Sequence, residues 1–94
     1  MTKIDQEELE SRRHAVDFAR VNNEFEGIYC TDQKYIDLNE QYARGEIELD
    51  AIGAYVDGLK NTWSKDDILD ERARNNRIHI LTGRRMLELQ ANPV

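Results

Sequence analysis

The chain has 94 residues, which is enough for one small domain with a single core. Its 13 basic and 19 acidic side chains give a net charge of −6, an electrostatic handicap against the phosphates of DNA. No apolar run is long enough to span a membrane, the N-terminus lacks the apolar stretch of a signal peptide, and a single cysteine cannot form an internal disulfide. These features predict a soluble protein of a reducing cytoplasm.

Residues 5–26 are rich in helix formers and contain neither glycine nor proline. Phe18, Val21 and Phe25 recur at intervals of three and four, which gives this helix an apolar face. Gly27 suits the left-handed position that commonly follows a helix end. We therefore expect the first helix over residues 5–26.

Two shorter helices follow. The first is expected over residues 32–44, with Thr31 as its N-cap and Gly45 beyond its end. The second begins after the connection at residues 46–48, because its apolar residues repeat at the spacing of an antiparallel helix pair. The apolar positions of the two helices are Tyr35, Leu38 and Tyr42, and then Leu49, Ile52, Val56 and Leu59.

The last third of the chain gives a weaker pattern. Ser64, with Asp67 three residues on, predicts a capping box and a helix that reaches at least to about residue 76. Residues 78–81 fit either a longer helix or a short extended run, and Gly83 is expected to break the pattern.

The predicted fold class is therefore all-α, a small bundle of three short-looped helices with an additional C-terminal helical segment. We expect residues 1–62 to form the helical domain, and we assign no role to the segment 63–94.

Few side chains suit catalysis. His14 and His79 lie far apart, and Cys30 has no adjacent base, so a partly buried thiol in a connecting loop is the favoured interpretation. The sequence contains no phosphate-binding glycine loop and no paired-cysteine metal motif, and its acidic clusters lack the spacing of a calcium loop. The sequence thus predicts a protein that is not an enzyme and has neither a metal nor a cofactor.

The end of the first helix is the best candidate for a functional site. Asn22 and Glu26 are four residues apart and share a helix face, which Ala15 and Ala19 continue as a narrow line of small residues. Glu26 falls at the negative end of the helix dipole, an unfavourable place for a carboxylate without a compensating cation. On spacing alone, a solvated surface glutamate is the more common explanation.

This stretch resembles a known motif. Asn22-x-x-x-Glu26-Gly27 is similar to the inhibitory motif of the VbhA-like antitoxins, which is usually written Ser/Thr-x-x-x-Glu-Gly/Asn. The resemblance continues through residues 41–50, an aromatic and basic helix end followed by Gly-Glu-Ile and an acidic helix start. Order and spacing agree over roughly residues 12–62, and residues 63–94 have no counterpart that we can place.

The resemblance implies a partner and a mechanism. VbhA-like antitoxins restrain Fic-domain toxins, which transfer AMP from ATP to a hydroxyl side chain of a target protein. By this resemblance Glu26 would enter the ATP site and pair with an arginine that otherwise holds the γ-phosphate, while Gly27 would let the chain turn away. Asn22 departs from the usual Ser or Thr, so a hydrogen-bonding role could persist but a hydroxyl-specific contact could not.

The same helix supplies a candidate interface with the toxin. Its residues are Ala15, Phe18, Ala19, Val21 and Phe25. The periodicity does not separate a toxin-facing surface from the chain's own core, and for the three large apolar residues the core is the better single expectation.

Two other functions remain open at this stage. A DNA-binding autoregulator would use the basic residues of the last third, although the net charge makes nucleic acid an unlikely partner. A plain helical adaptor is what the composition alone suggests. The basic residues in question are Arg72, Arg74, Arg77, Arg84 and Arg85.

Overall fold

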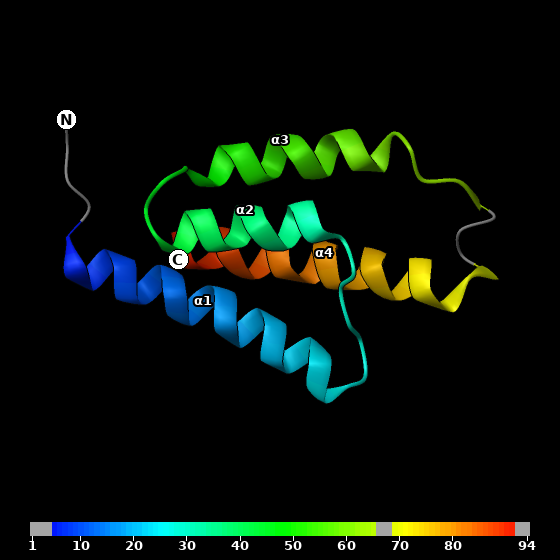
Figure 1. Ribbon diagram of the computed structural model, residues 1–94, viewed down its shortest axis with the longest axis horizontal. Helices are drawn as coiled ribbons and strands as arrows, with labels where there is room; N and C mark the ends of the chain where they lie inside the picture. The colour runs from blue at the N-terminus through cyan, green and yellow to red at the C-terminus, as the bar shows by residue number, and fades with distance from the viewer. Residues whose placement is uncertain (1–4, 66–68, 92–94) are drawn as a thin grey trace.

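The computed structural model describes residues 5–65 and 69–91, which form four helices and contain no strand. The helices are α1 (Gln6–Phe25), α2 (Gln33–Ala43), α3 (Leu49–Lys60) and α4 (Glu71–Ala91). α1 packs against α2 and α4, and α3 packs against the same two helices from the other side (Figure 1). The predicted all-α class is confirmed.

The helix ends follow from local side-chain chemistry. Asp5 caps α1 by accepting the Glu8 amide at 2.8 Å, and Asp32 caps α2 by accepting the Tyr35 amide at 3.0 Å. The expectation that Thr31 caps α2 is therefore wrong by one residue. The Asp32 carboxylate takes the role, and its position at the positive end of the helix dipole is favourable.

The C-terminal ends of α1 and α2 share one motif, as the glycines predict. Gly27 and Gly45 both have φ of +80°, a conformation in which other residues are strained. After α2, the Gly45 and Glu46 amides donate to the Tyr42 and Gln41 carbonyls at 3.0 and 2.9 Å. This is the Schellman arrangement, which satisfies helix-end carbonyls while the chain reverses.

The core lies where α2, α3 and α4 meet the first two-thirds of α1. Its largest fully buried side chains come from α2, α3 and α4: Tyr35, Tyr42, Ile52, Val56, Ile80 and Leu87. The apolar repeats predicted for α2 and α3 are thereby confirmed as core-facing. The α1 face in the core is different from the predicted one, because it consists of small residues with Val16.

The C-terminal segment forms the longest helix, and two expectations about it are wrong. α4 begins at Glu71, where the Asp70 carboxylate accepts the Arg72 and Ala73 amides, and not at Ser64. Asp67, the other half of the predicted capping box, lies outside the described residues.

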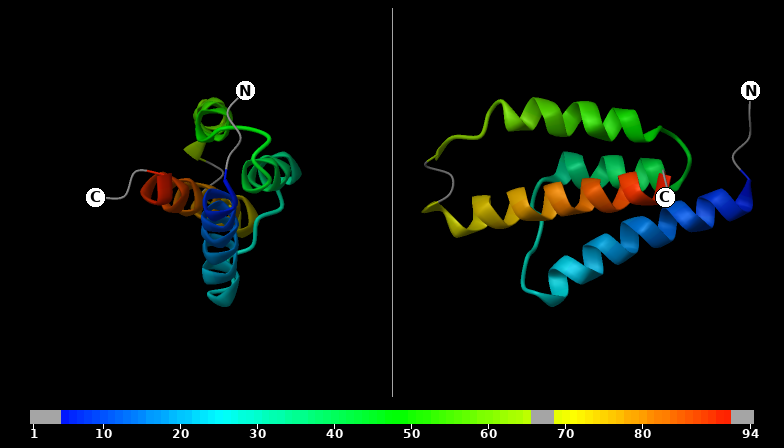
Figure 2. Two further views of the ribbon diagram at one scale, coloured as in Figure 1. Left: turned by 90° about the vertical axis from the view of Figure 1, so that its left-hand side faces the viewer. Right: turned by 180° about the vertical axis from the view of Figure 1, so that it is seen from behind.

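The helix also continues through Gly83, which was expected to break it. A Cβ atom at this position would lie 2.5 Å from the Tyr35 hydroxyl oxygen, so the glycine makes room for the Tyr35 side chain of α2 to reach the backbone of α4. The end-on view in Figure 2 shows α4 lying between α1 and α3, with α2 beside it.

Candidate functional site

The C-terminal turn of α1 presents the predicted motif residue Glu26 on the protein surface. Glu26 is the C-cap residue, and its amide donates to the Asn23 carbonyl at 3.1 Å. The Gly27 amide donates to the Glu24 carbonyl at 2.9 Å, and the Ile28 amide donates to the Asn23 carbonyl at 2.8 Å. These bonds form the same Schellman motif as at the end of α2, so Glu26 is carried on a defined turn.

The Glu26 side chain is exposed and has no ion-pair partner within residues 5–65 and 69–91. Its neighbour Glu24 is paired with Arg20 at 3.1 Å. Seven other acidic side chains of the described residues also take part in ion pairs: Glu8, Asp17, Glu40, Glu46, Glu48, Asp57 and Glu88. Glu26 differs from other exposed carboxylates in its place at the negative end of α1, where no ion pair offsets the helix dipole.

Asn22 and Glu26 lie on one face of α1, as their spacing predicts. Both line a groove between α1 and α4, together with Ala19, Arg85 and Met86. Asn22 is exposed beside Glu26, so its amide can donate to a bound partner or accept from one.

The predicted interface residues of α1 separate into two groups. Ala15 and Ala19 are each only 6% exposed, because α4 packs over them, and these two are not available to another protein. Phe18, Val21 and Phe25 are 46%, 53% and 90% exposed, so the expectation that they belong to the core is wrong. The small residues face the neighbouring helix, and the large apolar ones face solvent.

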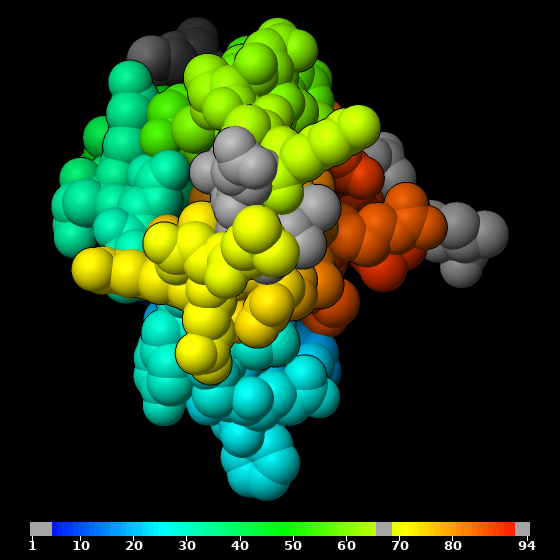
Figure 3. Space-filling model, turned by 90° about the vertical axis from the view of Figure 1, so that its right-hand side faces the viewer, coloured from blue at the N-terminus to red at the C-terminus, as the bar shows by residue number. Residues whose placement is uncertain are grey.

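The C-terminal end of α1, which carries these exposed apolar residues and Glu26, projects from the rest of the molecule. The C-terminal half of α1 diverges from α2 and α4 in Figure 1, and in Figure 3 the end of α1 and the following connection project beyond the start of α4. Exposed apolar side chains that gather on one side of a helix, as Phe18, Val21 and Phe25 do on α1, are more typical of a protein-binding surface than a single one would be.

The sequence did not single out Asn23, which the structure places at the centre of this turn. Its side chain is 8% exposed and reaches α4, where Nδ2 donates to the Thr82 hydroxyl at 3.0 Å. The helical spacing of the sequence could have indicated that Asn23 is buried. One stripe of α1 at intervals of four, three and four is buried, and it consists of Arg12, Val16, Ala19 and Asn23.

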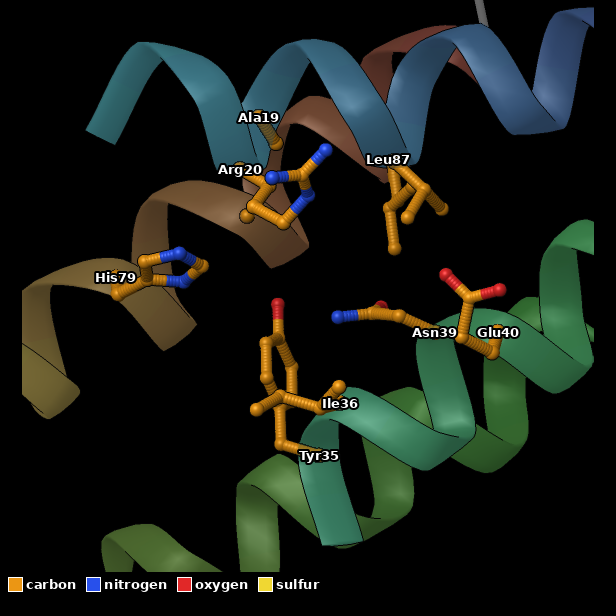
Figure 4. Close-up of a pocket in the computed structure, with 10 residues that line it drawn as sticks. Ala19, Arg20, Tyr35, Ile36, Asn39, Glu40, His79 and Leu87 are labelled. Atoms are coloured by element: carbon orange, nitrogen blue, oxygen red, sulfur yellow. The ribbon is translucent and has the colours of Figure 1, made fainter. Parts of the chain in front are cut away.

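A second candidate site is a partly enclosed cavity between α1, α2 and α4. Figure 4 shows Tyr35 and Asn39 of α2 pointing into it opposite His79 of α4. Burial raises the pKa of Tyr35 to about 12 and lowers the pKa of His79, so both are neutral near pH 7. Two charged residues also line the cavity, but Arg20 is paired with Glu24 and Glu40 is paired with Arg13. We therefore assign the cavity to the core.

The histidines, the acidic side chains and Cys30 are the remaining residues that could carry chemistry. No group of three His, Cys, Asp or Glu side chains there has the arrangement of a metal site. Cys30 is half-buried, and burial raises the pKa of its thiol, which disfavours the nucleophilic thiolate. None of the described helices is long and apolar enough to cross a membrane.

The basic residues of α4 are partly neutralised. Arg84 pairs with Asp57 at 2.6 Å and with Glu88 at 2.9 Å, and the Arg77 guanidinium lies 4.8 Å from the centre of the Trp63 ring. These contacts fasten α4 to α3 and to the connection before it. They leave a weaker positive surface for DNA than the sequence count suggests.

Comparison with known proteins adds one decisive observation. The family model for Antitoxin VbhA matches residues 12–59, which include α2, nearly all of α3, and α1 from Arg12 onward with its C-terminal turn. The chain belongs to the VbhA antitoxin family. No significant match was found among curated proteins or among solved structures.

The family assignment gives the surface on α1 a context. A VbhA antitoxin acts within a toxin–antitoxin pair, so its principal partner is a toxin, and the family is generally non-enzymatic. α4 lies outside residues 12–59, although it shares the core with the matched helices.

Proposed function

We propose that this antitoxin binds a Fic-domain toxin in the cytoplasm and blocks AMP transfer by placing Glu26 in the toxin's ATP site. The observation that carries the proposal is the exposed, unpaired carboxylate of Glu26 on the projecting turn of α1. The family assignment and the match of Asn22, Glu26 and Gly27 to the inhibitory motif support it.

The electrostatics of the turn suit an arginine partner. A carboxylate can accept two parallel hydrogen bonds from a guanidinium, which is the strongest common side-chain pairing. The carbonyl end of α1 adds partial negative charge beside Glu26 and makes the site more attractive to a cation. An arginine bound in this way cannot hold the γ-phosphate of ATP at the same time.

Displacing the γ-phosphate is sufficient to stop the reaction. AMP transfer requires the target hydroxyl to attack the α-phosphate in line with the leaving pyrophosphate. If the triphosphate binds with its γ-phosphate elsewhere, the α-phosphate is misplaced, and a misplacement of about 1 Å can cost about 100-fold in rate. Inhibition therefore does not require that ATP be excluded.

The exposed apolar residues of α1 supply the contact that holds Glu26 in place. Phe18, Val21 and Phe25 lie on the solvent side of the helix that carries the motif. Burying them in a complex would remove apolar surface from water, which is a large favourable term in protein association. The proposed interface thus keeps these three residues and omits Ala15 and Ala19.

The test uses a Fic-domain protein encoded beside this antitoxin. The two proteins are co-purified, and AMP transfer from labelled ATP is measured for wild type and Glu26→Gly. We expect both antitoxins to bind, the wild-type complex to be silent, and the variant complex to modify itself or a target. A silent variant complex would assign inhibition to steric cover, and failure to form a complex would favour the helical adaptor.

A further inference from the structure

Asn23 connects the motif turn to α4 through both its side chain and its backbone. The side-chain Nδ2 donates one hydrogen to the Ala19 carbonyl at 3.0 Å and the other to the Thr82 hydroxyl at 3.0 Å. The Thr82 hydroxyl in turn donates to the Ile78 carbonyl at 2.8 Å. The Asn23 carbonyl accepts the amides of Glu26 and Ile28, so one residue joins α4 to the turn that carries Glu26.

A second contact with α4 lies on the other side of the motif. The Thr31 amide donates to Asn76 Oδ1 at 2.6 Å, and Asn76 Nδ2 donates to the Thr31 hydroxyl at 2.8 Å. The segment between Asn23 and Thr31 contains Glu26 and Gly27 and is therefore fastened to α4 at both ends. The contact between Asn23 and Thr82 is part-buried, and the contact between Asn76 and Thr31 lies at the surface.

We propose that α4 acts as a brace that fixes the conformation of the inhibitory turn, with Asn23, Thr31, Asn76 and Thr82 as positioning residues. A helix end and the connection that follows it are ordinarily among the first parts of a protein to open. Two anchors to the longest helix restrict that opening. The effect on inhibition rests on the function proposed above, whereas the effect on the turn itself does not.

The physical benefit of a brace is preorganisation. A glutamate on a mobile turn loses conformational entropy when it enters a partner's site, and that loss reduces both affinity and the fraction of complexes with the carboxylate in place. α4 lies outside the matched residues 12–59, so this chain uses a segment beyond them to hold the motif.

Hydrogen exchange tests the brace without any toxin. Thr82→Val removes the hydroxyl with little change in shape, and Asn76→Ala removes the second anchor. We expect the Gly27 and Ile28 amides to exchange about fivefold faster in each variant, since each loses bonds of ordinary strength. The Gly45 and Glu46 amides belong to the matching turn after α2 and should keep their wild-type rates.

Two results would overturn the proposal. One is unchanged exchange at Gly27 and Ile28 in both variants. The other is equal acceleration at all four amides, which would mean that the variants only lower global stability. Thr82→Ser retains the hydroxyl and should restore wild-type exchange, whereas a purely packing role of the Thr82 methyl group would leave exchange fast.

A second readout connects the brace to inhibition. At saturating antitoxin, the Thr82→Val and Asn76→Ala double variant should leave residual AMP transfer several-fold above that of wild type, and Thr82→Ser should not. If the double variant inhibits as completely as wild type, the brace has no role in inhibition. If Glu26→Gly also fails to release AMP transfer, the proposed function has failed, and the exchange measurement still decides whether α4 fixes the turn.

Discussion

The contact between Gly83 of α4 and the Tyr35 side chain of α2 predicts a loss of stability for Gly83→Ala. The added Cβ would lie 2.5 Å from the Tyr35 hydroxyl oxygen, and carbon–oxygen contacts normally need about 3.3 Å, so one group must move by about 0.8 Å. Tyr35 is 1% exposed, and its hydroxyl donates to the Ile80 carbonyl at 3.3 Å, so a shift of the ring would disturb this buried hydrogen bond.

The magnitude follows from three opposing terms. Overpacking a core costs about 1–3 kcal/mol, and losing the Tyr35 hydrogen bond costs about 1 kcal/mol. Alanine regains about 1 kcal/mol because its helix propensity exceeds that of glycine. The net expectation is a loss of about 1–3 kcal/mol in the free energy of unfolding. For a domain of this size, each kcal/mol lost lowers Tm by about 4–8 °C.

Gly58→Ala is the matched control. Gly58 also lies inside a helix, but a Cβ there would meet nothing within 4 Å, so the substitution should stabilise the protein by up to about 1 kcal/mol. Urea unfolding followed by circular dichroism measures both changes. If Gly83→Ala stabilises the protein as Gly58→Ala does, the close contact with Tyr35 does not exist and the packing of α4 on α2 is wrong.

Three further predictions follow. The Arg12 guanidinium is 5% exposed and donates to two backbone carbonyls, so Arg12→Ala should cost about 2–3 kcal/mol in urea unfolding. Arg13→Ala breaks a partly exposed pair and should cost less than about 1 kcal/mol, and equal losses would contradict this contrast. Burial lowers the pKa of His79, so the stability it contributes is complete above pH 6.5 and is lost as the pH falls through the lowered pKa. His79→Gln should flatten the pH dependence of the urea midpoint in that range, and an unchanged slope would refute the assignment. Phe25→Ser should leave the urea midpoint nearly unchanged but weaken toxin binding about tenfold or more in calorimetry, and a core role would instead lower the midpoint.

The sequence predicts local features of this fold well. The glycines after α1 and α2 mark helix ends because each is preceded by an uninterrupted helical pattern and followed by a break in it. The positive φ at Gly27 and Gly45 depends only on the neighbouring residues, so the local sequence is sufficient to predict it.

The role of Gly83 depends on a residue distant in the sequence, so the local sequence does not predict it. Gly83 has the same residue type, but its role is to make space for Tyr35, a residue almost fifty positions earlier in the chain. Arg84 is similar, since its partner Asp57 comes from another helix and a count of basic residues cannot reveal the pairing.

The sequence predicted the helix end that carries Asn22, Glu26 and Gly27, and their inhibitory role stays a prediction. The face of α1 that enters the core was misassigned, because periodicity locates an apolar stripe without indicating whether the chain itself or a partner covers it. In this helix the alanines allow α4 to approach, and the aromatic residues stay outside.

The most direct test of the central claim isolates the charge of Glu26. AMP transfer by the purified toxin–antitoxin complex is measured over a range of ATP concentrations for Glu26→Gln, with Glu24→Gln as the control. Both side chains lie at the end of α1, but Glu24 is already paired with Arg20. We expect the Glu26→Gln complex to release AMP transfer and the Glu24→Gln complex to stay as silent as wild type. If Glu26→Gln is also silent although the toxin alone is active, the carboxylate does not cause the inhibition.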